Sequence, residues 1–388
     1  MDELSWHSHD EADVLQVRQG AFPVGFFAEL DFILPQLTSI DLSGHGLVNI
    51  DDNDAVVVGQ RCSNLETLTV GDCGRLTPAG YKAIIENCQR LRSVLVKLPK
   101  DVTMNRSVLE SILSIIARNC PFLEDLTIHK EGRCEVEPLT ACPSLGLLRC
   151  KKLCLSGLAM VEADFALLAQ NTTLESLHVS TGVLDDFCML ALAQGCQGLK
   201  ELKIQSRIGG DDDGPTHIGI GALSHAPFSR TLESISIECS GFDDDCLEQM
   251  SRFTSLQSIE LVHSFKDYTR TGLAALLTGC RFLRSIQLGG YGVENSDLRA
   301  IGAGCPLLER LVVPDGVDFS VAALRAVFSN CPALRELDIG ETTDTVITCI
   351  AHHVPRLEIL HVCGEANDVS VEVWNLLRRH CPSLRHIV

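Results

Sequence analysis

Cysteine and histidine are the residue types of this chain with most capacity for chemistry, with 18 cysteines and 13 histidines in 388 residues. Thiolates and imidazoles bind zinc, and paired thiols form disulfides. The densest group of cysteines is Cys134, Cys142, Cys150 and Cys154. Its spacing is not the Cys-x2-Cys pair that is typical of a structural zinc site. We therefore predict no metal site and no cofactor.

Motifs of the common enzyme classes are also missing from the sequence. There is no Walker loop, no Gly-x-Ser-x-Gly and no His-Glu-x-x-His. The segment Gly219–Ser224 begins like a dinucleotide fingerprint but lacks the third glycine. The histidine pairs His352-His353 and His7/His9 have no cysteine or carboxylate at ligand spacing. We predict that the chain is not an enzyme and has no catalytic residues.

Three acidic clusters each stand just before a helical pattern: Asp51-Asp52, Asp185-Asp186 and Asp243-Asp244-Asp245. A carboxylate at that position accepts hydrogen bonds from the free N–H groups of the first turn and meets the positive end of the helix dipole. We predict that these residues cap helices.

A fourth acidic run, Asp211–Asp213, lies between glycines in a long repeat, since 33 residues separate Leu199 from Leu232. The run lacks the alternating acids and the closing Glu of a calcium loop. Two interpretations stay open: a mobile solvated loop, or a contact with a partner beside the sheet.

The elements that must position all of these residues follow from one pattern, Leu-x-x-Leu-x-Leu, which recurs about every 26 residues. The repeats are led by Leu37, Leu65, Leu91, Leu123, Cys150, Leu174, Leu199, Leu232, Leu256, Leu283, Leu308, Leu334, Leu357 and Leu384. Cys142 offers a competing register for the fifth repeat, but Cys150 places Leu153 and Leu155 in the apolar columns. The fourth and sixth positions hold no polar residue, which indicates a short strand with one buried face.

A helical pattern follows each strand, and its apolar residues share one face. Examples are Leu109, Ile112, Ile115 and Ile116; Leu273, Leu276 and Leu277; and Leu324, Val327 and Phe328. One strand plus one helix cannot bury its apolar face alone, so the units must stack. We predict an α/β solenoid: a leucine-rich repeat horseshoe with a parallel β-sheet on the concave face and helices on the convex face.

Eight repeats carry a cysteine three residues before the leading leucine: Cys62, Cys88, Cys120, Cys196, Cys280, Cys305, Cys331 and Cys381. We expect these to be small buried residues at the helix-to-strand corner. Four are followed by proline, and the string Cys-Pro-x-Leu-x-x-Leu-x-Leu resembles the cysteine-containing leucine-rich repeat of F-box proteins. The Asn or Cys that this repeat carries after the strand is present only at Cys73.

The resemblance implies a substrate-recognition region of an SCF-type ubiquitin ligase receptor, acting in ubiquitin-dependent protein degradation. Adaptor and cullin subunits would then be partners, through an element not visible here, because the residues before Ala12 are too few for the three helices of an F-box. The alternative is a leucine-rich repeat scaffold or inhibitor unrelated to ubiquitination, resembling ribonuclease inhibitor.

Composition narrows the class of partner. The 51 acidic and 32 basic residues give a net charge of −19, which disfavours nucleic acid and anionic membrane. No apolar run reaches the length of a transmembrane helix, and the start has no signal-peptide pattern. Many cysteines without a secretion signal indicate a reducing compartment, the cytoplasm or the nucleus.

Side chains alternate along a strand, so the third, fifth and seventh positions of each repeat face the concave side. Most third positions are small and polar, which predicts a low-relief surface for a protein partner. A middle group of large or charged residues comprises Asp125, His129, Lys152, His178, Glu201, Lys203, Glu238 and Glu260. A second group comprises Arg310, Glu336, Asp338, Ile359 and His361.

Both ends of the sequence read as solenoid. Residues 1–36 form a degenerate N-terminal repeat or cap, led by Ala12, with Leu15 and Val17 in the buried columns and a helix near Phe26–Ile33. Residues 37–388 form about 14 repeats. Unpaired edge strands favour association with other chains. We therefore expect that the chain is part of a longer protein, that a partner covers its edge strands, or that the edges are tolerated without a cover.

Overall fold

A computed structural model describes residues 4–9, 12–17, 27, 33–43, 50–71, 75–98, 106–130, 140–181, 184–206, 214–238, 242–262, 268–289, 293–313, 319–341, 343–363 and 369–387. These residues form two compact units, Met1–Gly182 with Gln194–Gln197, and Val183–Ala193 with Gly198–Val388. The units are described separately, as unit 1 and unit 2. None of the described helices has the length and apolar character needed to cross a bilayer.

Unit 1 alternates strands with helices. Its strands are β1 (Leu4–His9), β2 (Ala12–Val17), β3 (Ser39–Leu42), β4 (Thr67–Val70), β5 (Ser93–Leu98), β6 (Asp125–Lys130), β7 (Lys152–Met160) and β8 (Ser176–Thr181). Its helices are η1 (Leu34–Gln36), α2 (Asp52–Arg61), α3 (Pro78–Asn87), α4 (Arg106–Asn119), η2 (Pro143–Leu147) and α5 (Glu162–Leu168).

Unit 2 continues the alternation. Its strands are β9 (Glu201–Ser206), β10 (Ser234–Glu238), β11 (Ser258–Val262), β12 (Ser285–Leu288), β13 (Arg310–Val312), β14 (Glu336–Glu341), β15 (Ile359–Cys363) and β16 (His386–Ile387). Its helices are α6 (Asp186–Gly195), most of which belongs to this unit, α7 (His217–His225), η3 (Pro227–Arg230), α8 (Asp244–Met250), α9 (Arg270–Gly279), α10 (Asn295–Gly304), α11 (Val321–Asn330), α12 (Asp344–His353) and α13 (Val371–His380).

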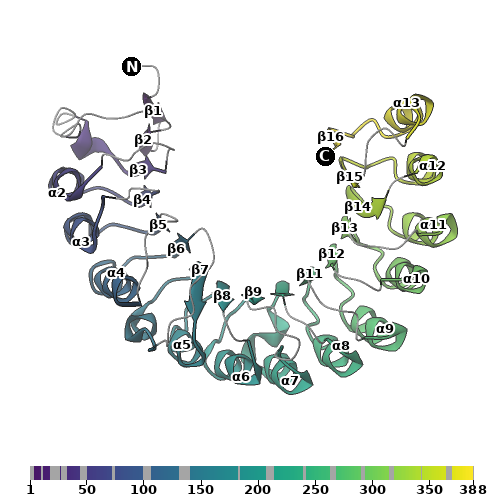
Figure 1. Ribbon diagram of the computed structural model, residues 1–388, viewed down its shortest axis with the longest axis horizontal. Helices are drawn as coiled ribbons and strands as arrows, with labels where there is room; N and C mark the ends of the chain where they lie inside the picture. The colour runs from purple at the N-terminus through teal and green to yellow at the C-terminus, as the bar shows by residue number, and fades with distance from the viewer. Residues whose placement is uncertain are drawn as a thin grey trace. The chain divides into compact units, whose positions relative to one another are not determined.

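The strands of each unit pair in chain order, and the repeat pattern sets their register. From β2 onward in unit 1, and throughout unit 2, neighbouring strands are parallel. Fourth positions face fourth positions, as Ile40 faces Leu68 and Leu337 faces Leu360. Within each unit the strands line the inner side of the curve and the helices its outer side (Figure 1). The predicted leucine-rich repeat solenoid is confirmed.

The two apolar columns are buried nearly throughout the described strands, as predicted. The exceptions lie in the last two strands, where Val362 is half-buried and Ile387 is 43% exposed. On the helices the predicted faces are buried, with one difference: α4 buries Leu113, and Ile115 is only half-buried. Leu113 lies closer to the line through Leu109 and Ile116, which α4 presents to the sheet.

All eight repeat cysteines are buried, as predicted, and most of them end a helix. Several also connect neighbouring coils. The Cys331 thiol donates to the carbonyl of Cys305 at 3.3 Å, and the Cys88 thiol donates to the carbonyl of Cys62 at 3.2 Å. A small apolar side chain with a weak donor therefore fits the corner better than alanine or serine.

The stretch before β7 departs from the strand–helix pattern, because the short η2 stands where other coils place a longer helix. Asp164 of α5 holds this stretch: it accepts from the backbone N–H of Cys142 at 2.8 Å and pairs with the guanidinium of Arg106. Leu153 and Leu155 fill the buried columns and face Leu126 and Ile128. The register led by Cys150 is therefore the one adopted.

The N-terminal strand β2 extends the parallel sheet of unit 1, with Leu15 opposite Ile40. The sequence pattern did not predict β1, which pairs with β2 in antiparallel fashion. Most of the helix expected near Phe26–Ile33 lies outside the described residues, although Phe27 is buried. The division at residue 36 stays a prediction.

Candidate protein-binding face

The residues predicted to bind a partner all lie on strands, and none is buried. Lys152 and Glu201 are exposed, and the others are half-buried. Unit 1 holds Asp125, His129, Lys152 and His178 of the middle group; unit 2 holds Glu201, Lys203, Glu238 and Glu260 of that group and all of the second group. Each unit therefore presents its own polar strand face.

On unit 2, Lys203 and Glu260 form an ion pair across an intervening strand. Ser236 of β10 is the register partner of Lys203 on β9 and of Glu260 on β11. The Lys203 Nζ lies 3.2 Å from the Glu260 Oε2, above Ser236, which is only 7% exposed. Two long side chains thus cover one small one, and the sheet face stays low in relief.

The second group forms a network centred on Arg310 of β13. The guanidinium of Arg310 donates to Glu336 at 2.8 Å on one side and to Gln287 at 3.1 Å on the other. The Nε2 of His361 lies 3.6 Å from the same Glu336 oxygen. These contacts cross four consecutive strands, β12 to β15, so the side chains are held in place rather than free to sample many rotamers.

On unit 1, Asp125 of β6 is the register partner of Lys152 on β7. Burial raises the pKa of the Asp125 carboxyl, and the charge of Lys152 partly offsets the rise. One strand further, the thiol of Cys154 lies 3.4 Å from the Nδ1 of His178. Strand alternation predicts His178 on this face, but no sequence motif gives Cys154 a role.

A ladder of charged residues at the second repeat positions was missed. In unit 1, Glu124 accepts from Lys151 at 2.9 Å and from Arg92 at 2.7 Å, and these hydrogen bonds lower the pKa of its carboxyl. In unit 2, Arg335 pairs with Glu358 at 2.8 Å. The signal was available, because opposite charges at equivalent positions of neighbouring repeats must lie side by side on parallel strands.

The acidic clusters cap helices, as predicted. Asp51 accepts from the N–H groups of Asn53 and Asp54, which lower the pKa of its carboxyl. Asp185 and Asp243 accept from the third helical residue, Cys188 at 3.0 Å and Cys246 at 2.8 Å. The Asp211–Asp213 run lies outside the described residues.

The next acidic residue in each cluster has a second role that the sequence did not reveal. Asp52, Asp186 and Asp244 accept from the backbone and hydroxyl of the threonine that caps the following helix, as Asp186 does from Thr216 at 2.8 and 2.7 Å. These bonds tie each coil to the next on the helical side.

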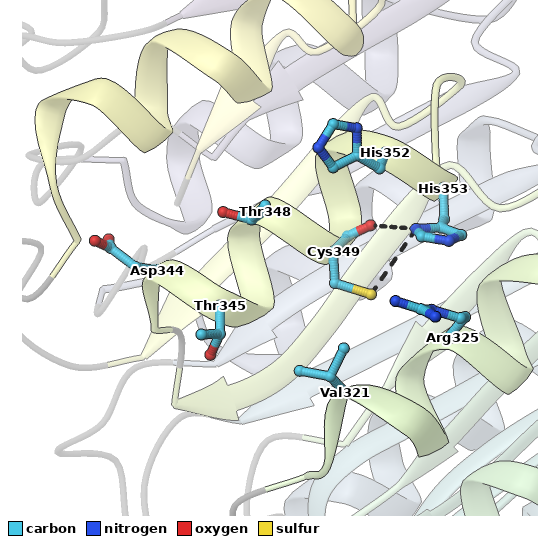
Figure 2. A pocket seen from close by; sticks show the side chains of 8 residues that line it. All are labelled: Val321, Arg325, Asp344, Thr345, Thr348, Cys349, His352 and His353. Atoms are coloured by element: carbon cyan, nitrogen blue, oxygen red, sulfur yellow. Dashed lines mark hydrogen bonds between the residues drawn. The ribbon is translucent and has the colours of Figure 1, made fainter.

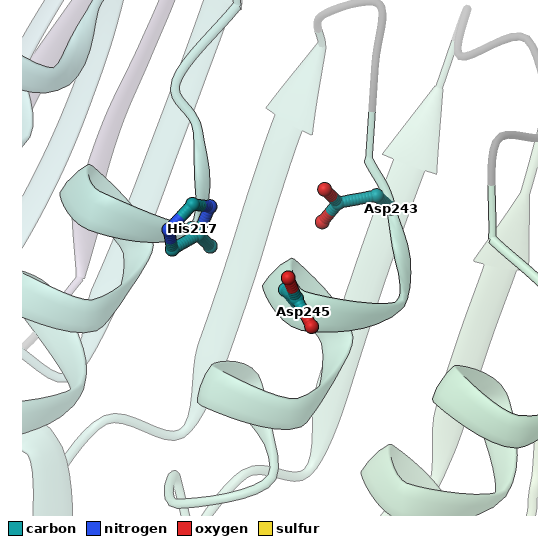
Figure 3. A group of neighbouring side chains, drawn as sticks. All are labelled: His217, Asp243 and Asp245. Atoms are coloured by element: carbon teal, nitrogen blue, oxygen red, sulfur yellow. The ribbon is translucent and has the colours of Figure 1, made fainter.

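One possible cation site lies among these caps. His217 of α7, Asp245 of α8 and Asp243, which caps α8, bring one ligand atom each within 4.8 Å of one another (Figure 3). His217 and Asp245 are exposed, and Asp243 is already engaged as a cap. Helix N-termini carry positive potential, which opposes a cation, and helix capping already accounts for Asp243.

A shallow pocket of about 340 Å³ lies on the helical side of unit 2, between α11 and α12. Figure 2 shows Arg325, Cys349 and His353 on one side of it and Asp344 and Thr345 on the other. His353 contacts the carbonyl of Cys349 at 2.9 Å, a contact within one helix. Mostly apolar walls and an open mouth suit a surface groove between packed helices.

Comparison with known proteins agrees with the fold. No family model matches the chain. Two rice proteins named coronatine-insensitive protein homolog 2, from Oryza sativa subspecies indica and japonica, are 26% identical over 252 residues. The match covers 62% of this chain but only 38% of those proteins.

A solved structure has a similar fold. Rad7, in the crystal structure of the yeast Rad7 and Elc1 complex, superposes with a TM-score of 0.55 at 17% identity, over 89% of this chain and 80% of that one. The fold of the chain is therefore a leucine-rich repeat solenoid, and its sequence is distantly similar to that of an F-box/LRR protein.

Proposed function

We propose that the polar strand faces of this chain bind a protein partner, and that the chain is the substrate-recognition part of an F-box-type ubiquitin ligase receptor. The observation that carries the binding proposal is the lateral pairing of charges on unit 2, from Lys203 to Glu260 and from Arg310 to Glu336 and His361. Paired, half-buried charges form a rigid polar surface. A partner that binds it does not have to immobilise these side chains, which lowers the entropic cost of binding.

The class of partner follows from the relief of this surface. Ser234, Ser258 and Ser285 occupy third positions of successive strands and leave the backbone close to the face. A small molecule needs a concave site that encloses most of its surface, whereas a protein surface can lie along a flat strip. The strand face of unit 2 has the low relief expected of a surface that binds a protein.

The role in ubiquitination rests on the Cys-Pro repeats and on the distant similarity to the rice proteins, of which this chain matches 38%. Under this proposal the protein works in the cytoplasm or the nucleus, where adaptor and cullin subunits are present. The reducing conditions there suit its buried free thiols.

Affinity purification of the tagged chain from its native cell lysate, followed by mass spectrometry, tests both parts. Recovery of adaptor and cullin subunits together with a substrate supports the ligase role. If a partner is retained without adaptor and cullin subunits, the result supports a leucine-rich repeat scaffold or inhibitor unrelated to ubiquitination. Retention of no protein above the untagged control contradicts the binding proposal itself.

A further inference from the structure

One cysteine differs from the other described cysteines in its exposure. Among the cysteines whose burial the structure describes, only Cys154 is not buried. Burial raises the thiol pKa of most of the others, to about 12 at Cys88 and Cys305 and to about 11 at Cys331. Thiols of that kind stay protonated and shielded, and so react slowly. Cys154 alone among them has access to reagents from solvent.

The surroundings of Cys154 suit a reactive thiol. Cys154 on β7 is the register partner of His178 on β8, and its Sγ lies 3.4 Å from the Nδ1 of that imidazole. Lys152 stands two residues earlier on β7, hence on the same face, and is exposed. An imidazole at this distance can accept the thiol proton, and a nearby ammonium favours the thiolate.

A hydroxyl without a partner lies on the same stretch of sheet. Ser180 is two residues beyond His178 on β8 and therefore on the same face. It is 1% exposed, and its Oγ makes no hydrogen bond within the described part of the chain. A buried hydroxyl is normally satisfied, so this position retains a capacity to bind a polar group.

We propose that Cys154 is a nucleophilic thiol that forms a mixed disulfide with low-molecular-weight disulfides of the glutathione type. His178 Nδ1 accepts the proton of the Cys154 thiol. The thiolate attacks one sulfur of the disulfide, the Cys154–sulfur bond forms, and the original sulfur–sulfur bond breaks. The electron pair leaves with the second sulfur, which takes the proton from His178 as a free thiol.

The adduct would stand on the exposed strand face of unit 1, since Cys154 and His178 both lie at fifth repeat positions there. The exchange is reversible, because a free thiol in excess attacks the mixed disulfide and restores Cys154. This inference concerns the chemistry of the chain alone and does not depend on the proposed partner or on ubiquitination.

The test is incubation of the full chain with oxidised glutathione, with the adduct located and timed by peptide mass spectrometry. We expect the Cys154 peptide to gain one glutathionyl group and the buried Cys331 to stay unmodified. Protection of Cys331 also shows that the chain is folded. The His178→Asn variant should slow the Cys154 reaction about tenfold at pH 7, because it loses the proton acceptor. His380→Asn, an exposed histidine at the end of α13 on unit 2, is the matched control and should leave the rate unchanged.

A pH profile gives a second measurement. In the native chain the rate at Cys154 should rise with an inflection below the ordinary thiol pKa of about 8.5, and His178→Asn should return the inflection to about 8.5. Equal rates in the native chain and in His178→Asn would overturn the proposal. So would a Cys154 peptide that stays unmodified while Cys331 remains protected.

Discussion

The carboxylate of Asp244, at the start of α8, binds the cap residue of the next helix. Asp244 accepts from both the backbone N–H and the hydroxyl of Thr269 at 2.6 Å, and from the N–H of Gly272 at 3.1 Å. Thr269 in turn caps α9 by accepting from Thr271. One carboxylate thus orients the cap of the next helix, and this cap lies 25 residues later in the sequence.

Replacing Asp244 with alanine should loosen the contact between α8 and α9. Three charge-assisted hydrogen bonds are lost at a partly exposed site, so we expect a loss of about 1–2 kcal/mol in the free energy of unfolding. Urea unfolding monitored by circular dichroism measures it. Asp245→Ala is the matched control, because Asp245 is exposed and makes none of these contacts; an equal loss in both variants would contradict the account.

The same contact predicts a dependence of stability on pH. The hydroxyl of Thr269, then the N–H groups of Thr269 and Gly272, lower the pKa of Asp244 below its ordinary 3.8. A carboxyl with a depressed folded-state pKa stabilises the fold above its ordinary pKa and loses that contribution as the pH falls through the folded value. Acid titration of wild type and Asp244→Asn should therefore show curves that converge below pH 3.8. Parallel curves would contradict the assignment.

The strand register, the buried columns and the corner cysteines could be predicted because each depends on residues within one repeat. The link from Asp244 to Thr269 could not, since a carboxylate before a helix is already explained by the cap of its own helix. The pair Lys203 and Glu260 was missed for a related reason: its members face across an intervening strand, and only the three-dimensional register shows that Ser236 is small enough to allow contact.

The candidate face was predictable as a surface but not as a set of contacts. Alternation along each strand placed Asp125, Lys152 and His361 on the polar side. Which neighbour each side chain binds depends on rotamers and side-chain length, as Arg310 shows by reaching both Gln287 and Glu336. Likewise, the sequence shows Cys154 only as one of a group of cysteines, because its contact with His178 depends on the pairing of two strands.

The ion pair of the buried Asp164 with the half-buried Arg106 should be among the most sensitive polar positions of unit 1. The Asp164 side chain is fully buried, and it accepts from the N–H groups of Cys142 and Val161 as well as from Arg106. Asp164→Ala removes the carboxylate beside a guanidinium that is only 12% exposed, and it takes the acceptor from two backbone N–H groups. Arg106 keeps its hydrogen bond to the carbonyl of Thr140 at 2.9 Å, and we expect a loss of about 3–5 kcal/mol. Thermal unfolding measures it.

Glu162→Ala is the control for Asp164, because Glu162 is exposed on the same helix. It should change the unfolding free energy by less than about 0.5 kcal/mol. A small effect of Asp164→Ala would show that the stretch around η2 is held by other contacts, such as the hydrogen bond from Ser144 to Glu110 at 2.5 Å.

Gly157 should tolerate no side chain. Its φ angle is +75°, and an added Cβ would lie 1.9 Å from the carbonyl oxygen of Lys130 on the neighbouring strand. Gly157→Ala combines a strained backbone with a steric clash, so we expect a loss of more than about 2 kcal/mol. The control is Gly198→Ala, where the added Cβ meets no atom within 4 Å. Equal unfolding midpoints for the two variants would contradict the geometry.

The ion pair of Lys203 and Glu260 should matter little for stability. The two side chains are 29% and 27% exposed, so solvent screens their attraction. Reversing Lys203 alone should cost at most about 1 kcal/mol in unfolding free energy. The double exchange Lys203→Glu with Glu260→Lys should recover the lost stability. A double-mutant cycle based on urea unfolding measures this recovery. A loss that the exchange leaves unrestored would show that the two charges do not interact.

Partner retention by variants of this face tests the central claim most directly. The tagged chain carrying Glu201→Lys, Lys203→Glu and Glu260→Lys is compared in native lysate with wild type and with a control that carries Lys82→Glu and Glu86→Lys, an exposed pair on α3. We predict that the strand-face variant retains at least about tenfold less of the partner than wild type, because reversed charges remove complementarity. The control should retain as much of the partner as wild type. Equal retention by all three proteins would contradict the assignment of the strand face of unit 2 as the binding surface.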